Sequence, residues 1–218
     1  MNSSTRTFPW TIVIGLLLVT LTLTLAFLLA NLKSRSTHPQ ALPVIAQVND
    51  FALTNQSGAT VSLNDLRGHV WIADIIFTRC PGPCLRMTRQ MKELEAALVG
   101  NNEVKLISLT TDPEFDTPPI LSKYAERFNA DTNRWNFLTG TKKQIAEVAS
   151  GSLKLAAVEK TPSARESDDD LFIHSTIFVA VDKHGRLRGI FETGGEGVDW
   201  SQSKQRILTT IKNLEQEP

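Results

Sequence analysis

The chain has no excess of either charge. Its 23 Lys and Arg residues balance 23 Asp and Glu residues, so the formal net charge is zero. No basic stripe is present either, which argues against a nucleic-acid partner. The sequence also has no internal repeat and no long low-complexity tract. Its 218 residues suffice for one membrane segment and one domain of about 150–170 residues.

Charged residues are absent from Thr7 to Leu32. Within this stretch, residues 11–30 are rich in Leu, Val and Ile, and their polar members are threonines, which can bond back to their own helix. A helix of about 20 apolar residues spans a bilayer core. A cleaved signal peptide is the alternative, but its apolar region is shorter, and Ala30-Asn31-Leu32 is a poor cleavage site. We therefore expect an uncleaved membrane anchor over residues 1–32.

The pattern after this stretch predicts one α/β domain. Residues 33–46 contain two prolines and few large apolar groups, which predicts a linker before a domain at residues 47–218. Residues 69–77 are almost continuously apolar and β-branched, as in a central strand buried on both faces. Further strands are expected at 50–54, 61–63, 104–109, 172–181 and 187–191, and helices at 85–99, 118–128, 142–149 and 200–214. This order is typical of a thioredoxin-type domain.

Cysteine is scarce, and the two that occur lie together in Arg79-Cys80-Pro81-Gly82-Pro83-Cys84. They follow the central strand and precede a helix that we expect to start near Pro83. The exposed amides and the dipole of a helix start favour anionic sulfur, so we expect lowered pKa values for both thiols. Two cysteines do not establish an oxidising compartment, but they are compatible with one.

Two thiolates this close can form a disulfide or hold one soft metal ion. Thioredoxin-like redox motifs carry two residues between the cysteines, whereas this chain has three. The wider loop can place both sulfurs on one side of an ion, which suits copper or zinc. A purely structural disulfide is the plainer alternative, but so small a ring stabilises by only roughly 2 kcal/mol.

A metal held by two thiolates needs a further ligand. The four histidines are His38 in the linker, His69 at the start of the central strand, His184 in a hairpin turn and His174 at the start of a strand. From the residues alone, His174 is more simply interpreted as a packed or hydrogen-bonded residue. Met87 and Met91 are also soft ligands, but their helical spacing favours a core stripe.

Several stretches in order resemble the SCO/SenC family of membrane-anchored, thioredoxin-fold copper proteins. The similarity covers about residues 48–192 and the N-terminal anchor. Phe77-Thr78-Arg79-Cys80-Pro81 with Cys84 matches the family's C-P-x-x-C motif, and His174-Ser175 falls at its H-S motif. Further matches are Phe51-Ala52-Leu53, Ser62-Leu63-Asn64-Asp65-Leu66-Arg67-Gly68, Ser108 to Pro118 with one residue extra, Tyr124-Ala125 and Phe137-Leu138-Thr139-Gly140.

The resemblance implies a thioredoxin-like fold with an added N-terminal β-hairpin, preceded by one transmembrane helix. It implies a copper site of Cys80, Cys84 and His174, in a metallochaperone more than an enzyme. Such proteins deliver copper to the binuclear copper centre of cytochrome c oxidase or reduce its cysteines, so the copper-centre subunit is the expected partner. Other copper chaperones or thiol reductants are further partners. The domain would face the periplasm or another extracytoplasmic space, or the mitochondrial intermembrane space in a eukaryote.

Two positions depart from the family pattern. Gly82 stands where the family carries an acidic residue, and Leu85 where it carries proline. A missing carboxylate near the ligands affects copper affinity or partner docking. Asp74, inside the predicted central strand, is a candidate substitute, although an edge or turn-facing aspartate is the interpretation that we favour. Asp112 is left without a role.

Two other functions fit the dithiol. A metal-free thiol–disulfide oxidoreductase needs only the cysteine pair at a helix start. A copper- or redox-sensing interaction protein is the third hypothesis, and the sequence carries no partner motif that supports it. A peroxidase would need a peroxide pocket beside a nucleophilic cysteine, and no such pocket is recognisable in the sequence.

Overall fold

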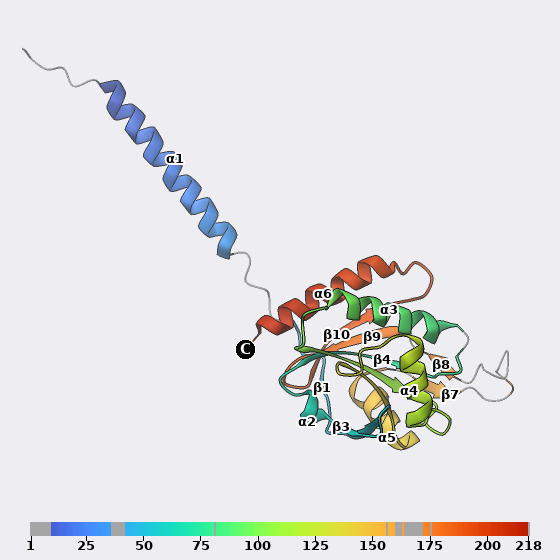
Figure 1. Cartoon of the computed structure of the whole chain (residues 1–218). Coiled ribbons are helices and arrows are strands. Elements are labelled where there is room, and N and C mark those ends of the chain that lie inside the picture. Colours follow the sequence, from blue (N-terminus) through green and yellow to red (C-terminus); the bar gives the residue numbers. More distant parts are fainter. Residues whose placement is uncertain are drawn as a thin grey trace, which may run out of the picture. The chain divides into compact units, whose positions relative to one another are not determined.

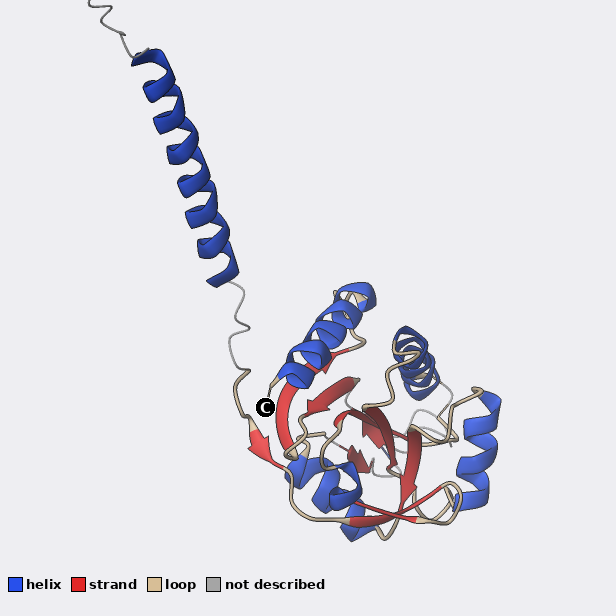
Figure 2. Cartoon of the chain, turned by 60° about the vertical axis from the view of Figure 1, so that its left-hand side comes forward, coloured by secondary structure: helices blue, strands red, loops and turns tan. Residues whose placement is uncertain are grey.

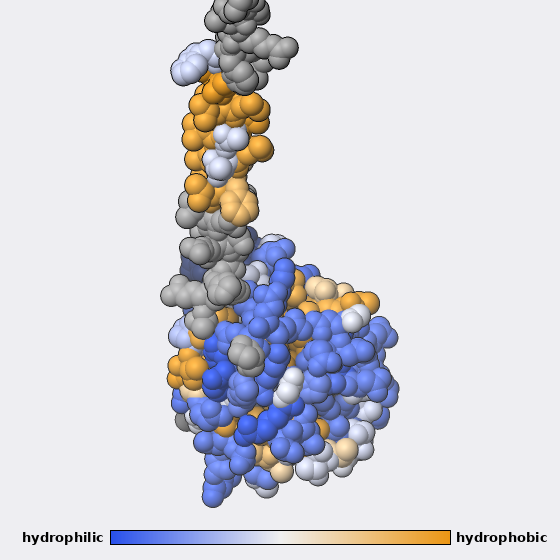
Figure 3. All heavy atoms as spheres, turned by 90° about the vertical axis from the view of Figure 1, so that its left-hand side faces the viewer, coloured by the Kyte–Doolittle hydropathy of each residue, from blue (hydrophilic) through white to orange (hydrophobic). Residues whose placement is uncertain are grey.

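The computed structural model describes residues 10–35, 42–80, 82–155, 157–159, 163, 172–174 and 176–217. The chain falls into two units, Met1–Gln40 and Ala41–Pro218 (Figure 1). The first contains helix α1, Trp10–Arg35. Large apolar side chains such as Leu16, Leu21 and Phe27 are exposed on it, and its surface is mostly hydrophobic (Figure 3). No helix within the described residues is long and apolar enough to cross a membrane. The predicted transmembrane helix therefore lacks support from the structure.

The second unit is built on a twisted sheet that has eight strands within the described residues, in the order β1-β10-β9-β4-β5-β6-β2-β3. β4 (Val70–Ile76), β5 (Val104–Thr110) and β6 (Trp135–Thr139) run parallel at its centre. β9 (Ile177–Val181) and β10 (Arg186–Glu192) run antiparallel beside β4. β1 (Ala46–Gln47) is the short strand at that edge. All seven residues of β4 are buried, as expected of a central strand covered on both faces.

The predicted N-terminal hairpin is formed by β2 (Ala52–Asn55) and β3 (Thr60–Ser62), which pair antiparallel. β2 also pairs with β6 and so joins the hairpin to the main sheet. The side chain of Asn55 closes the turn, because its Oδ1 accepts from the backbone amides of Ser57 and Ala59. The mixed α/β, thioredoxin-like architecture expected from the sequence is therefore confirmed.

Helices cover both faces of the sheet (Figure 2). α3 (Pro83–Ala97), α4 (Pro118–Arg127) and α6 (Trp200–Gln216) contribute to one apolar core. α2 (Leu63–Leu66), α5 (Lys142–Ala146) and the π-helix η1 (Glu147–Ser152) contribute to the core on the other face. Thr141 caps α5 as its position predicted, accepting from the Gln144 amide over 3.2 Å. The expected helix over 142–149 is thus an α-helix that continues as a π-helix.

One expectation about strands is wrong, and one short strand was not expected. The apolar run at 172–181 is not one strand: β8 (Phe172–His174) pairs with β7 (Ala157–Glu159) in a separate two-stranded sheet, and only β9 belongs to the main sheet. The end of the expected linker is also structured, because Ala46 pairs with Leu187 in β1. Arg188 holds the segment just before it by donating from Nε to the Leu42 carbonyl over 3.1 Å. Both differences depend on pairing between distant segments, which local apolar patterns do not encode.

Candidate metal centre

The two cysteines lie between the end of β4 and the start of α3. The chain leaves β4 at Ile76 and turns tightly, with the Cys80 amide donating to the Phe77 carbonyl over 3.2 Å. α3 begins at Pro83, as the sequence predicted, so Cys84 lies in its first turn. Neither cysteine is in a disulfide, and both are buried, with 3% of Cys80 and none of Cys84 exposed.

The expected low thiol pKa is wrong for Cys84. A hydrogen bond with the Cys80 side chain raises the pKa of Cys84 above its ordinary value, and burial raises it further. The negative charge of Asp74 adds a smaller effect in the same direction. Cys84 lies at a helix start, but the hydrogen bond with Cys80 and the removal of Cys84 from water together outweigh the favourable helix dipole. Without a bound cation, the structure therefore keeps this sulfur protonated.

The turn before Cys80 is fixed by a buried carboxylate that the sequence did not single out. Asp116 accepts from the Thr78 amide over 3.1 Å, from the Thr78 hydroxyl, and from the Thr110 hydroxyl over 2.5 Å. Burial raises the pKa of Asp116, although these hydrogen bonds oppose that shift. The carboxylate thereby links the loop after β4 to the loop after β5.

A second contact between the loop after β4 and the loop after β5 joins Arg79 to Asp112. Arg79 donates from Nη2 to Oδ2 of Asp112 over 2.5 Å, and its guanidinium carbon lies 4.1 Å from the centre of the Phe115 ring. Asp112, which had no assigned role, therefore orients the residue next to Cys80. The two aspartates in the segment that follows β5, Asp112 and Asp116, were the available signal for both links.

Asp74 is not at an edge and does not face a turn, so the interpretation that we favoured for it is wrong. It is fully buried in β4, and neither carboxylate oxygen has a hydrogen-bond partner within the described structure. Burial raises the pKa of Asp74 to about 7, opposed in part by the neighbouring Ser108 hydroxyl.

The other expected site residues have different outcomes. Met87 and Met91 are fully buried in the core, which confirms the core-stripe interpretation. The backbone of His174 ends β8 opposite Ala157, but its side chain lies outside the description, as do His38 and Pro81. No group of three His, Cys, Asp or Glu suited to a metal occurs within the described residues. The complete set of Cys80, Cys84 and His174 therefore stays a prediction.

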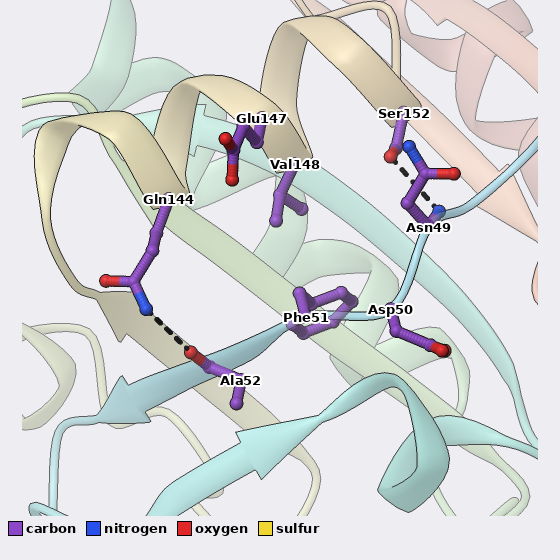
Figure 4. A pocket seen from close by; sticks show the side chains of 8 residues that line it. All are labelled: Asn49, Asp50, Phe51, Ala52, Gln144, Glu147, Val148 and Ser152. Carbon is purple, nitrogen blue, oxygen red and sulfur yellow. Dashed lines mark hydrogen bonds between the residues drawn. The ribbon is translucent and has the colours of Figure 1, made fainter.

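A pocket of about 450 Å³ lies elsewhere, lined by the segment before β2 and by α5 and η1 (Figure 4). Gln144 donates to the Ala52 carbonyl over 3.4 Å at one end, and the Asn49 amide donates to the Ser152 hydroxyl over 3.2 Å at the other. α5 and η1 belong to the core on the face of the sheet opposite the cysteines. The pocket lining contains no cysteine or histidine, so it does not extend the dithiol site.

Comparison with known proteins places this fold and dithiol in a family. The family model described as SCO1/SenC matches residues 40–209. The chain belongs to the SCO1/SenC family. Among its relatives, the SCO1 protein homolog of Bacillus subtilis is 38% identical over 147 residues, which is 66% of this chain and 73% of the relative.

Solved structures of the family share the fold. BsSco is a member of the Sco family of cytochrome c oxidase assembly proteins, and a disulfide switch was identified in it. Its structure is 32% identical to this chain and superposes with a TM-score of 0.66, over 82% of this chain and all of BsSco. A SCO1/SenC family lipoprotein from Bacillus anthracis is 27% identical with a TM-score of 0.66, over 78% of this chain and 95% of the lipoprotein. Copper-bound ScoI of Bradyrhizobium japonicum, at 23% identity, shows only the shared fold.

Proposed function

We propose that this protein binds copper through Cys80, Cys84 and His174 and delivers it to the binuclear copper centre of cytochrome c oxidase during assembly. The observation that carries the proposal is a buried pair of cysteines, outside any disulfide, between a central strand and a helix start. Thiolates are soft donors that suit copper(I), and an added imidazole suits copper(II). Met87 and Met91 continue the apolar stripe of α3 into the core, and we propose His174 as the third ligand.

The relatives support the same function. BsSco belongs to a family of cytochrome c oxidase assembly proteins. A protein of Stutzerimonas stutzeri, 27% identical over 150 residues, is named for copper binding. The copper-centre subunit of the oxidase is therefore the partner that we propose.

Copper titration of the reduced full-length protein tests the ligand set. We expect one copper per chain, and we expect Cys80→Ser and Cys84→Ser to abolish tight binding of either copper ion. His174→Ala should weaken copper(II) binding and change its absorption spectrum more than it weakens copper(I) binding. His69→Ala is the matched control, because Nδ1 of His69 lies 3.1 Å from the Glu103 carbonyl oxygen, at the opposite end of β4 from the cysteines. An unchanged copper(II) spectrum in His174→Ala would remove His174 from the site.

A metal-free thiol–disulfide oxidoreductase is the second candidate. It is favoured by the direct hydrogen bond between the two thiols and by the disulfide switch of BsSco. A redox titration of the copper-free protein separates the two functions. Negligible copper affinity together with a dithiol potential in the range of thiol–disulfide catalysts would favour this second candidate.

We also propose that residues 1–32 anchor the chain in a membrane, with residues 33–46 as a linker and residues 47–218 as the extracytoplasmic domain. The uncharged stretch from Thr7 to Leu32 supports the anchor. The anchor predicts that the full-length protein resists carbonate extraction from membranes and that a variant lacking residues 1–32 does not. Release of the full-length protein by carbonate would contradict it.

A further inference from the structure

Asp74 is the most unusual side chain near the dithiol. It lies in the middle of β4, between β5 and β9, with none of its surface exposed. Its cross-strand neighbour Ser108 uses its hydroxyl to accept from Nε1 of Trp135 over 3.0 Å. Within the described structure, both carboxylate oxygens of Asp74 are left without a hydrogen-bond partner.

Strand geometry places Asp74 on the cysteine side of the sheet. Successive side chains of a strand alternate between faces, so Asp74 shares a face with Ile72 and Ile76. Those two residues belong to the core that contains Cys80 and Cys84. The charge of Asp74 accordingly acts through space on Cys84 and on the Tyr124 hydroxyl, raising the pKa of each.

Within the described residues, no Lys, Arg or His forms an ion pair with this carboxyl or lowers its pKa. Its charge acts on the Cys84 thiol and the Tyr124 phenol, and the Ser108 hydroxyl partly opposes the rise of its own pKa. A buried carboxylate without a hydrogen bond or an opposite charge costs free energy, which is why such groups occur paired or beside a bound cation. An apolar residue here would suit the core better, so Asp74 weakens the fold unless a cation becomes its partner.

We propose that Asp74 is the counter-charge for the cation held by the dithiol and that it makes the site favour copper(II) over copper(I). The inference rests on the proposed function, since the cation is copper. The attraction between a carboxylate and an ion grows with the charge of the ion, so a buried Asp74 stabilises the divalent ion more than the monovalent one. The same charge disfavours bare thiolates when no cation is present.

The test uses the full-length protein and Asp74→Asn, which keeps the shape of the side chain and removes its charge. We expect copper(II) affinity to fall at least tenfold relative to copper(I) affinity. The midpoint potential of bound copper, measured by spectroelectrochemistry, should then rise by about 59 mV or more. Asp50→Asn is the matched control, because the Asp50 side chain is 94% exposed and lies outside the core that contains the cysteines.

A second variant tests whether Asp74 destabilises the fold of the copper-free protein. Asp74→Leu replaces the carboxyl with an apolar side chain of similar size, and we expect the copper-free variant to unfold at a higher urea concentration than the wild type. A lower midpoint would show that Asp74 has a structural partner and would overturn the inference. A midpoint potential of bound copper in Asp74→Asn equal to that of the wild type would overturn the inference as well. If the wild type binds no copper, the proposed function itself fails, which separates the two outcomes.

Discussion

The backbone amide of Thr78 donates to Oδ2 of Asp116 over 3.1 Å, and this hydrogen bond fixes the turn that leads into Cys80. The hydroxyls of Thr78 and Thr110 donate to the same carboxylate. A single buried side chain thereby positions one cysteine against the two central strands of the sheet.

Asp116→Ala should therefore be strongly destabilising. The change leaves three donors without an acceptor in a buried region, and each unsatisfied donor costs about 1–3 kcal/mol. Because removal of the carboxylate also relieves its own burial, we expect a net loss of about 3 kcal/mol in the free energy of unfolding. Urea unfolding of the full-length protein measures it. Asp50→Ala, at an exposed site, is the control, and equal losses in the two variants would show that Asp116 does not anchor the turn.

The ion pair between Arg188 and Glu217 predicts a pH-dependent stability. Arg188 donates from Nη1 to Oε2 of Glu217 over 2.7 Å, and this hydrogen bond lowers the pKa of Glu217 below its ordinary value of 4.5. A lowered pKa means that the stabilisation is present above pH 4.5 and disappears as the pH falls through the lower, folded-state pKa. Glu217→Gln should therefore be less stable than the wild type at pH 7, and the difference should vanish in acid.

Urea unfolding of both proteins between pH 3 and pH 7 measures this difference. Glu196→Gln is the control, because Glu196 is exposed and has no ion pair within the described residues. A difference between Glu217→Gln and the wild type that stayed constant with pH would show that the carboxylate charge is not its source.

A larger residue at position 189 should create a packing defect. The register between β9 and β10 shifts beside this residue, and a Cβ atom here would lie 2.7 Å from Cζ of the buried Phe191 ring. We expect Gly189→Ala to destabilise the domain by about 1–3 kcal/mol through overpacking. Gly151→Ala is the matched control, since no atom lies within 4 Å of its added Cβ. Similar unfolding midpoints for the two variants would refute the prediction.

The raised pKa of Cys84 predicts slow alkylation in the copper-free protein. Thiolate is the reactive form, and a buried thiol with a raised pKa supplies little of it near pH 7. Iodoacetamide should therefore modify Cys84 much more slowly in the folded protein than in urea, with a rate that rises as the pH increases above 8. Tandem mass spectrometry of the tryptic peptide that contains both cysteines follows the reaction. Rapid alkylation at pH 7 would contradict this prediction and support the low thiol pKa that the helix start predicts.

Local patterns in the sequence predicted much of the fold. The continuous apolar run around β4 identified the central strand, Pro83 marked the start of α3, and Thr141 marked the start of α5. These signals are local because strand burial, proline geometry and capping act within a few residues. The ordered family motifs added the hairpin of β2 and β3, which the structure confirms.

The sequence by itself determined that the only two cysteines meet at a strand-to-helix turn, because four residues of chain cannot separate them. Only the tertiary structure decided their chemistry. The hydrogen bond with Cys80 and burial in the core raise the pKa of Cys84, and core packing places Asp74 on the same face of the sheet, without a hydrogen-bond partner among the described residues. Likewise, only the folded chain brings Asp116 under Thr78 and Asp112 against Arg79, because those contacts join two loops more than 30 residues apart.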